Sequence, residues 1–320
     1  MIRFLHRMLA TAALIPLAFC SPLSSSQSAM AQDAPPAMPP PSVPPVVPVA
    51  DDADPALWVV KDDDTTIYLF GTVHMLKPGL SWFDEAVKEA FDKSGSLVIE
   101  AILPEDPAVM AEKIIPLAVD QTGQTLSSQL TDAQRAAYEA AMSKYDLPVG
   151  QFDMFEPWYA GMVLSAVMLQ KAGFDGEQGS EKILTAAAKA AGKPVTALET
   201  FEQQMGFFDG LPRADQLRFL NDAVAQGPQA EAEFSEIVFA WARGNPDELA
   251  VRMNRAMQGS EALAKVLLYE RNARWADAIK AKLDQPGTLF IAVGAGHLAG
   301  EKSVQDYLGK LGLTAQRIAY

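Results

Sequence analysis

Two histidines close similar motifs near opposite ends of the chain. One motif is LFGTVH, at residues 69–74, and the other is IAVGAGH, at residues 291–297. Each is an apolar run typical of a buried strand, and each ends in Gly-x-x-His. The third histidine of the chain, His6, lies in a segment that we expect the mature protein to lose. Any histidine chemistry therefore falls to His74 and His297.

Two glutamates also end apolar runs that are typical of strands. Glu100 is in SLVIEA and Glu199 closes KPVTALE. In α/β sheets, ligands gather at the carboxyl ends of the strands. Two histidines and one carboxylate form a common ligand set for Mn²⁺, Co²⁺ or Zn²⁺, and such a metal lowers the pKa of bound water to ~7. His74, Glu100 and His297 are thus candidate metal ligands, and the chemistry would be hydrolysis.

Each of these residues also has a structural interpretation, which stays open. A histidine at a strand end can simply be hydrogen-bonded within the fold. A carboxylate such as Glu100 is costly to bury without a partner, and Arg271 could form a salt bridge with it. Arg271 could instead stabilise an oxyanion or remain a solvated helix charge. Glu199 could act as a general base, cap the following helix or pair with a lysine.

The first residues predict export. Residues 1–31 have a basic start, an apolar run of twelve residues from Met8 to Phe19, and a small-x-small pattern that ends at Ala31, where we expect cleavage. The apolar run is too short for a permanent transmembrane helix. Cys20 suggests a lipoprotein as an alternative, but Phe19 stands where such signals need a small residue. Cleavage after Ala31 leaves no cysteine.

The rest of the chain predicts a linker followed by an α/β domain. Residues 32–53 are rich in proline and should form an extended, poorly packed linker. From Asp54 to Tyr320, we expect a hairpin in residues 56–74, a helix from Ser81 to Ser94 and a strand in 96–101. Residues 106–282 read as mostly helical around one strand at 193–199. A strand at 287–297, a helix near Gly300 and a strand at 314–320 then complete a mixed sheet with a helical insertion.

Charge and motifs exclude several classes. The mature chain would carry 24 basic and 40 acidic residues, so nucleic acid is not an expected partner. It contains no Gly-x-Ser-x-Gly elbow, no His-Glu-x-x-His helix and no Gly-x-Gly-x-x-Gly site at its glycine-rich segments. Serine hydrolases, standard zincins and dinucleotide-binding proteins are therefore disfavoured.

The motifs resemble the TraB/GumN family in spacing and order. The resemblance rests on IYLFGTVHMLKPG, LVIEA, KPVTALETFEQQ, YERNARW and IAVGAGHLAGEKSVQDYLGKLG. The family is similar to the Tiki proteins, which are metal-dependent proteases, and more distantly to erythromycin esterase and ChaN-like proteins. The resemblance implies a site made by these residues: Gly71, His74, Glu100, Arg271, Asn272, Gly294 and His297. Arg271 and Asn272 are then expected to be catalytic, and Gly71 and Gly294 to bind the cofactor. A further segment, GFDGEQGSEKIL, makes Asp175 a weaker candidate.

The resemblance and the residues together predict an exported, metal-dependent hydrolase that cleaves peptides or another small exported substrate. His74, Glu100 and His297 would hold the metal, Arg271 would steady the oxyanion, and the general base is open. The alternative is a non-catalytic binding protein that sequesters a peptide or signalling molecule, or an accessory factor for exopolysaccharide production. Unlike Tiki proteins, the chain shows no membrane anchor after the domain, so a membrane substrate is not implied.

Overall fold

The computed structural model describes residues 51–256 and 261–320. The predicted signal peptide and residues 32–50 of the predicted linker lie outside the described residues. Residues 51–53 of the predicted linker are structured, because strand β1 (Asp51–Asp52) pairs in parallel with β4 (Leu80–Ser81). Ala53, the next residue, is already buried in the core.

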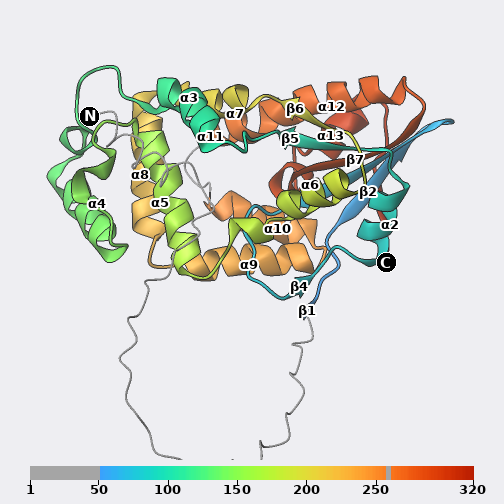
Figure 1. The fold of residues 1–320 in the computed structure, drawn as a ribbon, viewed down its shortest axis with the longest axis horizontal. Helices are drawn as coiled ribbons and strands as arrows, with labels where there is room; N and C mark the ends of the chain where they lie inside the picture. The colour runs from blue at the N-terminus through green and yellow to red at the C-terminus, as the bar shows by residue number, and fades with distance from the viewer. Residues whose placement is uncertain (1–50, 257–260) are drawn as a thin grey trace, which may run out of the picture.

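A mixed six-stranded sheet forms the centre of the fold (Figure 1). Its strand order is β6-β5-β7-β3-β2-β8. The four strands β6, β5, β7 and β3 are parallel to one another, whereas β2 pairs antiparallel with both of its neighbours, β3 and β8. The bounds are β2 Leu57–Lys61, β3 Thr65–Thr72, β5 Ser96–Ala101, β6 Val195–Glu199, β7 Gly287–Gly294 and β8 Gln316–Ile318.

The two ends of the chain meet in the middle of this sheet. Strand β3 forms the predicted hairpin with β2, and on its other side it pairs in parallel with β7. The register aligns Gly71 with Val293 and Thr72 with Gly294. The two Gly-x-x-His motifs therefore leave the sheet from neighbouring strands, in the same direction.

Helices fill the middle of the sequence, as predicted. Those before β6 are α2 (Glu85–Lys93), α3 (Pro107–Ala118), α4 (Asp132–Lys144), α5 (Pro157–Lys171) and α6 (Ser180–Ala190). Those after it are α7 (Phe201–Asp209), α8 (Arg213–Gln226), α9 (Ala230–Ala242), α10 (Pro246–Ala256), α11 (Glu261–Ala264), α12 (Glu270–Leu283) and α13 (Val304–Lys310). The fold class, a mixed sheet built from both chain ends with a helical insertion, is confirmed.

Hydrophobic packing divides the molecule into a sheet region and a helical region. The two faces of the sheet are covered by separate clusters, one around Phe70 and Phe290 and the other around Ile291 and Trp275. A third cluster joins α3, α4, α5, α7 and α8 around the fully buried Trp158. Figure 1 shows α4, α5 and α8 together at the end of the molecule away from α2. None of the helices that the structure describes is long and apolar enough to cross a membrane.

Two predicted helix starts differ from the structure. Helix α2 begins at Glu85 after the N-cap Asp84, and Ser81 instead ends β4 and donates its hydroxyl to the Asp84 carboxylate. Helix α13 begins at Val304, because Ser303 caps it by accepting the Asp306 backbone N–H. Sequence periodicity locates a helix better than its first residue.

Candidate functional site

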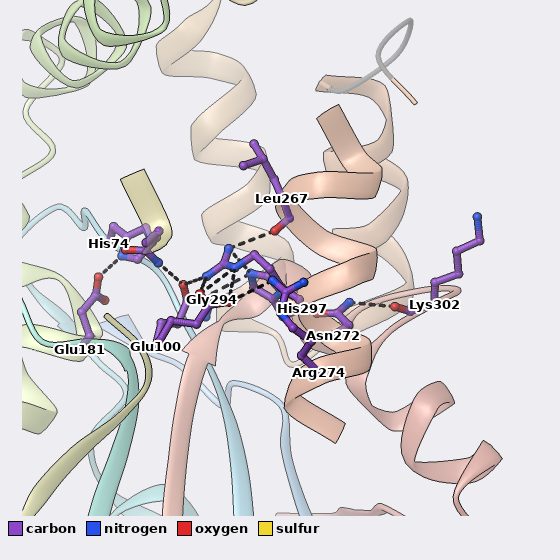
Figure 2. A network of polar contacts seen from close by, with 12 residues as sticks. His74, Glu100, Glu181, Leu267, Asn272, Arg274, Gly294, His297 and Lys302 are labelled. Carbon is purple, nitrogen blue, oxygen red and sulfur yellow. Dashed lines mark hydrogen bonds and ion pairs between the residues drawn. The ribbon is translucent and has the colours of Figure 1, made fainter. Parts of the chain in front are cut away.

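Four adjacent parallel strands bring the predicted residues to one edge of the sheet. The strands lie in the order β3, β7, β5, β6 across the sheet. His74 follows the end of β3, His297 follows the end of β7, Glu100 is the last residue but one of β5, and Glu199 is the last residue of β6. Parallel strands all end at the same edge, so this arrangement follows from the topology. In Figure 2, Glu100 lies between His74 on one side and His297 on the other.

Glu100 is held by three donors and is ionised. Its Oε1 accepts the Gly294 backbone N–H at 2.6 Å, and its Oε2 accepts from Arg271 Nη2 and Gln204 Nε2, each at 2.7 Å. Burial by itself would raise the pKa of Glu100, but electrostatic interactions with His297, Arg271 and His74 and the Gly294 hydrogen bond lower this pKa to about 2. The site thus contains a fixed negative charge.

His297 is buried with one definite tautomer. Its Nδ1 lies 2.6 Å from Asn272 Oδ1, and the Asn272 amide nitrogen donates to the Lys302 carbonyl at 2.8 Å. Because the amide oxygen must then face the ring, Nδ1 carries the hydrogen and Nε2 has the lone pair. Nε2 lies 3.6 Å from Glu100 Oε1. His297 therefore presents an unprotonated Nε2 beside a carboxylate, and this nitrogen accepts from Arg271 Nη1 at 3.2 Å.

The neutral form of His297 is strongly favoured. The side chain is 6% exposed and packs on Trp275, with the ring centroids 4.4 Å apart. Burial lowers the pKa of His297, the charge of Glu100 opposes this, and nearby Arg271 lowers the pKa further, to about 3. A neutral imidazole is the form that binds a metal.

Each nitrogen of the Arg271 guanidinium has a hydrogen-bond partner. Its Nε donates to both Glu199 oxygens, at 3.2 and 2.9 Å, and its Nη2 donates to Glu100. Its Nη1 donates to the Leu267 carbonyl at 3.0 Å and lies 3.2 Å from His297 Nε2. The guanidinium thus ties two strand-end carboxylates to helix α12, and no nitrogen is left over for an oxyanion.

Glu199 has the contacts of a structural partner. It is 8% exposed, its two oxygens accept from Arg271 Nε, and Arg274 Nη2 lies 3.5 Å from its Oε1. These contacts favour the structural interpretation of Glu199, and its catalytic role stays a prediction. Thr200, the next residue, is the residue that caps α7, with a capping box.

Glu181 contacts His74 and was not predicted. Its Oε1 pairs with His74 Nδ1 at the first turn of α6. The His74 side chain is 69% exposed, whereas that of Glu181 is 20% exposed. Within the part of the chain that the structure describes, Glu181 Oε2 is buried and has no hydrogen-bond partner. Figure 2 shows this pair on the side of Glu100 opposite His297.

The start of α6 is docked on the loop that carries His74. The Ser180 hydroxyl accepts the Val73 backbone N–H at 2.8 Å, and the Ser180 N–H donates to the Val73 carbonyl at 3.0 Å. A Cβ on Gly179 would lie 2.3 Å from the His74 carbonyl oxygen, so only glycine permits this approach. These contacts fix Glu181 beside His74.

The predicted glycines, Gly71 and Gly294, allow close packing of the backbone around the site. A Cβ on Gly71 would lie 2.9 Å from Ala295 Cα, so glycine allows β3 to pack closely against the turn before His297. A Cβ on Gly294 would lie 3.0 Å from Glu100 Oε1. Their predicted cofactor-binding role stays a prediction.

Asp175, the weaker candidate, has a local role. Its side chain accepts the Glu177 N–H at 2.9 Å and so caps the short 3₁₀ helix Gly176–Gln178. Its backbone pairs with Leu76. Asp175 therefore helps to hold the loop after His74.

A profile of the TraB/PrgY/gumN family matches residues 56–317. The chain belongs to the TraB/PrgY/gumN family. It is 26% identical over 254 residues to Uncharacterized protein YbaP of Escherichia coli K12, and this match covers 79% of this chain and 92% of that protein. It is 23% identical over 317 residues to Metalloprotease TIKI2 of Danio rerio, and this match covers 82% of this chain and 60% of that protein. No solved structure matches.

Membership of the TraB/PrgY/gumN family raises the question of whether the site suits a metal. Among the described residues, no group of three or more His, Cys, Asp or Glu side chains is already arranged around a common point for a metal. The side chains that could ligate a metal are nevertheless in suitable states. His297 is neutral with an unprotonated Nε2 that now accepts from Arg271, Glu100 is ionised, and the buried Glu181 Oε2 beside His74 has no donor among the described residues. An acceptor without a donor is the feature that a bound cation would satisfy.

Proposed function

We propose that the mature chain is an exported, metal-dependent hydrolase that cleaves peptide bonds. The observation that carries the proposal is the matched state of the two imidazoles. A side-chain oxygen engages Nδ1 of each ring, Glu181 at His74 and Asn272 at His297. Metal-binding histidines are commonly oriented in this way, with the second nitrogen left for the metal.

His74, His297 and Glu100 are the residues that would hold the metal. Glu181 and Asn272 would orient the two rings, and the Gly294 N–H would orient the Glu100 carboxylate. When bound, a divalent metal such as Mn²⁺, Co²⁺ or Zn²⁺ supplies Lewis acidity, which makes water a usable nucleophile at neutral pH. The similarity to Metalloprotease TIKI2 supports this assignment.

In this proposal, Arg271 acts on the carboxylates and not on the reacting bond. It keeps Glu100 ionised and fixes it between β5 and α12, with Glu199 as its second partner. Phe207 and Trp275 lie over its guanidinium, at 5.6 and 4.6 Å, and exclude water from that ion pair. Arg271 is therefore a positioning residue for Glu100.

One observation favours the alternative of a non-catalytic binding protein. Both Glu100 oxygens are already engaged by donors, so metal binding requires at least one of these hydrogen bonds to be exchanged. A chain that binds a peptide at the same strand ends without hydrolysing it would need no such exchange. Turnover by the metal-loaded protein separates the two functions.

The test is hydrolysis by the mature chain, Gln32 to Tyr320. The protein is stripped of metal, reloaded separately with Mn²⁺, Co²⁺ or Zn²⁺, and incubated with a random peptide library that is read by mass spectrometry. We expect cleavage with at least one metal, none after chelation, and a loss of at least a hundredfold in Glu100→Ala. Cleavage that persists equally in chelator or in Glu100→Ala would contradict the proposal, and absence of cleavage with every metal would favour the binding protein.

Export is tested by the N-terminus of the processed protein. Cleavage after Ala31 gives a chain that begins at Gln32. A chain recovered with Cys20 as its lipidated first residue would instead establish a lipoprotein, and an uncleaved chain in the cytoplasm would contradict export.

A further inference from the structure

Arg274 is a second arginine at the same site, one helical turn after Arg271. Its side chain is 50% exposed, whereas that of Arg271 is 7% exposed. Figure 2 shows Arg274 on α12, the helix that also carries Asn272. The site therefore has one buried arginine and one that is open to solvent.

The two arginines differ in the number of donors that remain. Every nitrogen of Arg271 has a partner. Among the residues that the structure describes, Arg274 has one ion pair, 3.5 Å from its Nη2 to Glu199 Oε1. That distance is too long for a strong hydrogen bond, and Glu199 already accepts two hydrogen bonds from Arg271. Because a guanidinium has five N–H donors, Arg274 keeps most of its hydrogen-bonding capacity.

Phe207 on α7 holds this free guanidinium in place. The Arg274 guanidinium carbon lies 5.2 Å from the centroid of the Phe207 ring, and that of Arg271 lies 5.6 Å from the same ring. Stacking on an aromatic ring reduces the freedom of an arginine side chain without using its donors. Arg274 is thus oriented, half-exposed and short of acceptors.

The group that suits such a guanidinium is a carboxylate. A planar fork of N–H donors matches the two oxygens of a carboxylate. The protein as a whole has a formal net charge of −14, so an anionic ligand is disfavoured over much of the surface and needs a local positive group. Arg274 supplies that group at the edge of the site.

We propose that Arg274 binds a carboxylate of the substrate and makes the site prefer peptides that carry one near the scissile bond. A role in substrate binding rests on the proposed hydrolase function, but carboxylate binding by Arg274 does not require turnover. The carboxylate could be the free C-terminus of a short peptide or an acidic side chain. Both present the same two oxygens, and the experiment separates them.

The test measures retention of peptide pools by the mature chain, with and without Mn²⁺, by size exclusion and mass spectrometry. Three pools of random hexapeptides are compared: one without acidic residues and amidated, the same pool with a free C-terminal carboxylate, and the amidated pool with one Asp or Glu. We expect at least one carboxylate-bearing pool to be retained about tenfold more than the neutral pool. The pool that is enriched identifies the source of the carboxylate.

Three variants assign the preference to the side chain. Arg274→Gln should abolish it and Arg274→Lys should keep part of it, because lysine retains the charge but not the fork. Arg218→Gln is the matched control, since it removes a half-exposed arginine from α8 that is paired with Asp215, and it should keep the full preference. Equal retention of all pools, no retention of any pool, or an unchanged preference in Arg274→Gln would overturn the inference.

Failure of the inference is distinguishable from failure of the hydrolase proposal. Cleavage of retained peptides is followed in the same samples. A carboxylate preference without cleavage would support the role of Arg274 and contradict the hydrolase. Cleavage without a carboxylate preference would do the reverse.

Discussion

Asn272 and His297 are joined by a hydrogen bond of 2.6 Å between Oδ1 and Nδ1, which fixes the tautomer of the buried imidazole. Asn272 is itself held by the Lys302 carbonyl. The orientation of His297 therefore depends on the Asn272 amide, which would contact the proposed metal only through the His297 ring.

This relationship predicts different results for two substitutions of Asn272. Asn272→Asp keeps an oxygen for the His297 Nδ1–H and should keep metal binding. Asn272→Leu removes the acceptor, which should weaken metal affinity about 10- to 100-fold and destabilise the fold by about 1–3 kcal/mol because a buried N–H loses its partner. Metal titration and thermal unfolding of both variants measure these effects. Equal metal affinities in the two variants would show that the tautomer of His297 does not matter.

The strand-end residues could be predicted from sequence because the topology decides where they lie. Apolar runs indicated the strands, and parallel strands end at one edge, so His74, Glu100, Glu199 and His297 were expected together. The pairing of Arg271 with Glu100 was also anticipated, as the structural interpretation of both residues. No tertiary detail was needed for these predictions.

The partners of those residues could not be predicted, because they depend on how helices pack. Glu181 reaches His74 across 107 positions only because Ser180 and Gly179 dock α6 on the His74 loop. The sequence drew attention to this segment but pointed to Asp175. Gln204 similarly reaches Glu100 from α7, across 104 positions. A glutamate in the first turn of a helix gives no sequence signal of the strand that it will face.

The neutral state of His297 predicts how stability depends on pH. Burial lowers the pKa of His297 from 6.5 to about 3, so between these values the unfolded chain binds one more proton at this residue than the folded chain. Stability should therefore fall as pH falls below 6.5, by about 1.4 kcal/mol per pH unit from this residue. Glu100 adds a loss in the same direction only below its ordinary value of 4.5, as pH approaches about 2.

The measurement is urea unfolding of the metal-free chain between pH 6.5 and 4.5, with His297→Gln as the comparison. The variant should show a shallower loss of stability across this range, because glutamine does not titrate. Parallel curves for the parent and the variant would mean that His297 is protonated as readily in the folded chain as in the unfolded one.

Close packing at Gly71 predicts a cost for the smallest possible side chain. Gly71→Ala would bring a methyl group within 2.9 Å of Ala295 Cα and should destabilise the fold by about 1–3 kcal/mol. Gly309→Ala in α13 is the matched control. A Cβ there meets nothing within 4 Å, so the fold should gain up to about 1 kcal/mol from the higher helix propensity of alanine. Chemical denaturation of both variants gives the comparison, and equal stabilities would refute the close contact.

The most direct test of the proposed site is the metal content of the purified mature chain. After loading with Mn²⁺, Co²⁺ or Zn²⁺ and removal of excess metal, we expect about one equivalent in the parent. His74→Ala/His297→Ala should lose it, and Glu177→Gln, a half-exposed glutamate near Glu181 that pairs with Lys182, should retain it. Circular dichroism confirms that the double variant remains folded. One equivalent retained by a folded His74→Ala/His297→Ala protein would contradict a metal site between the two Gly-x-x-His motifs.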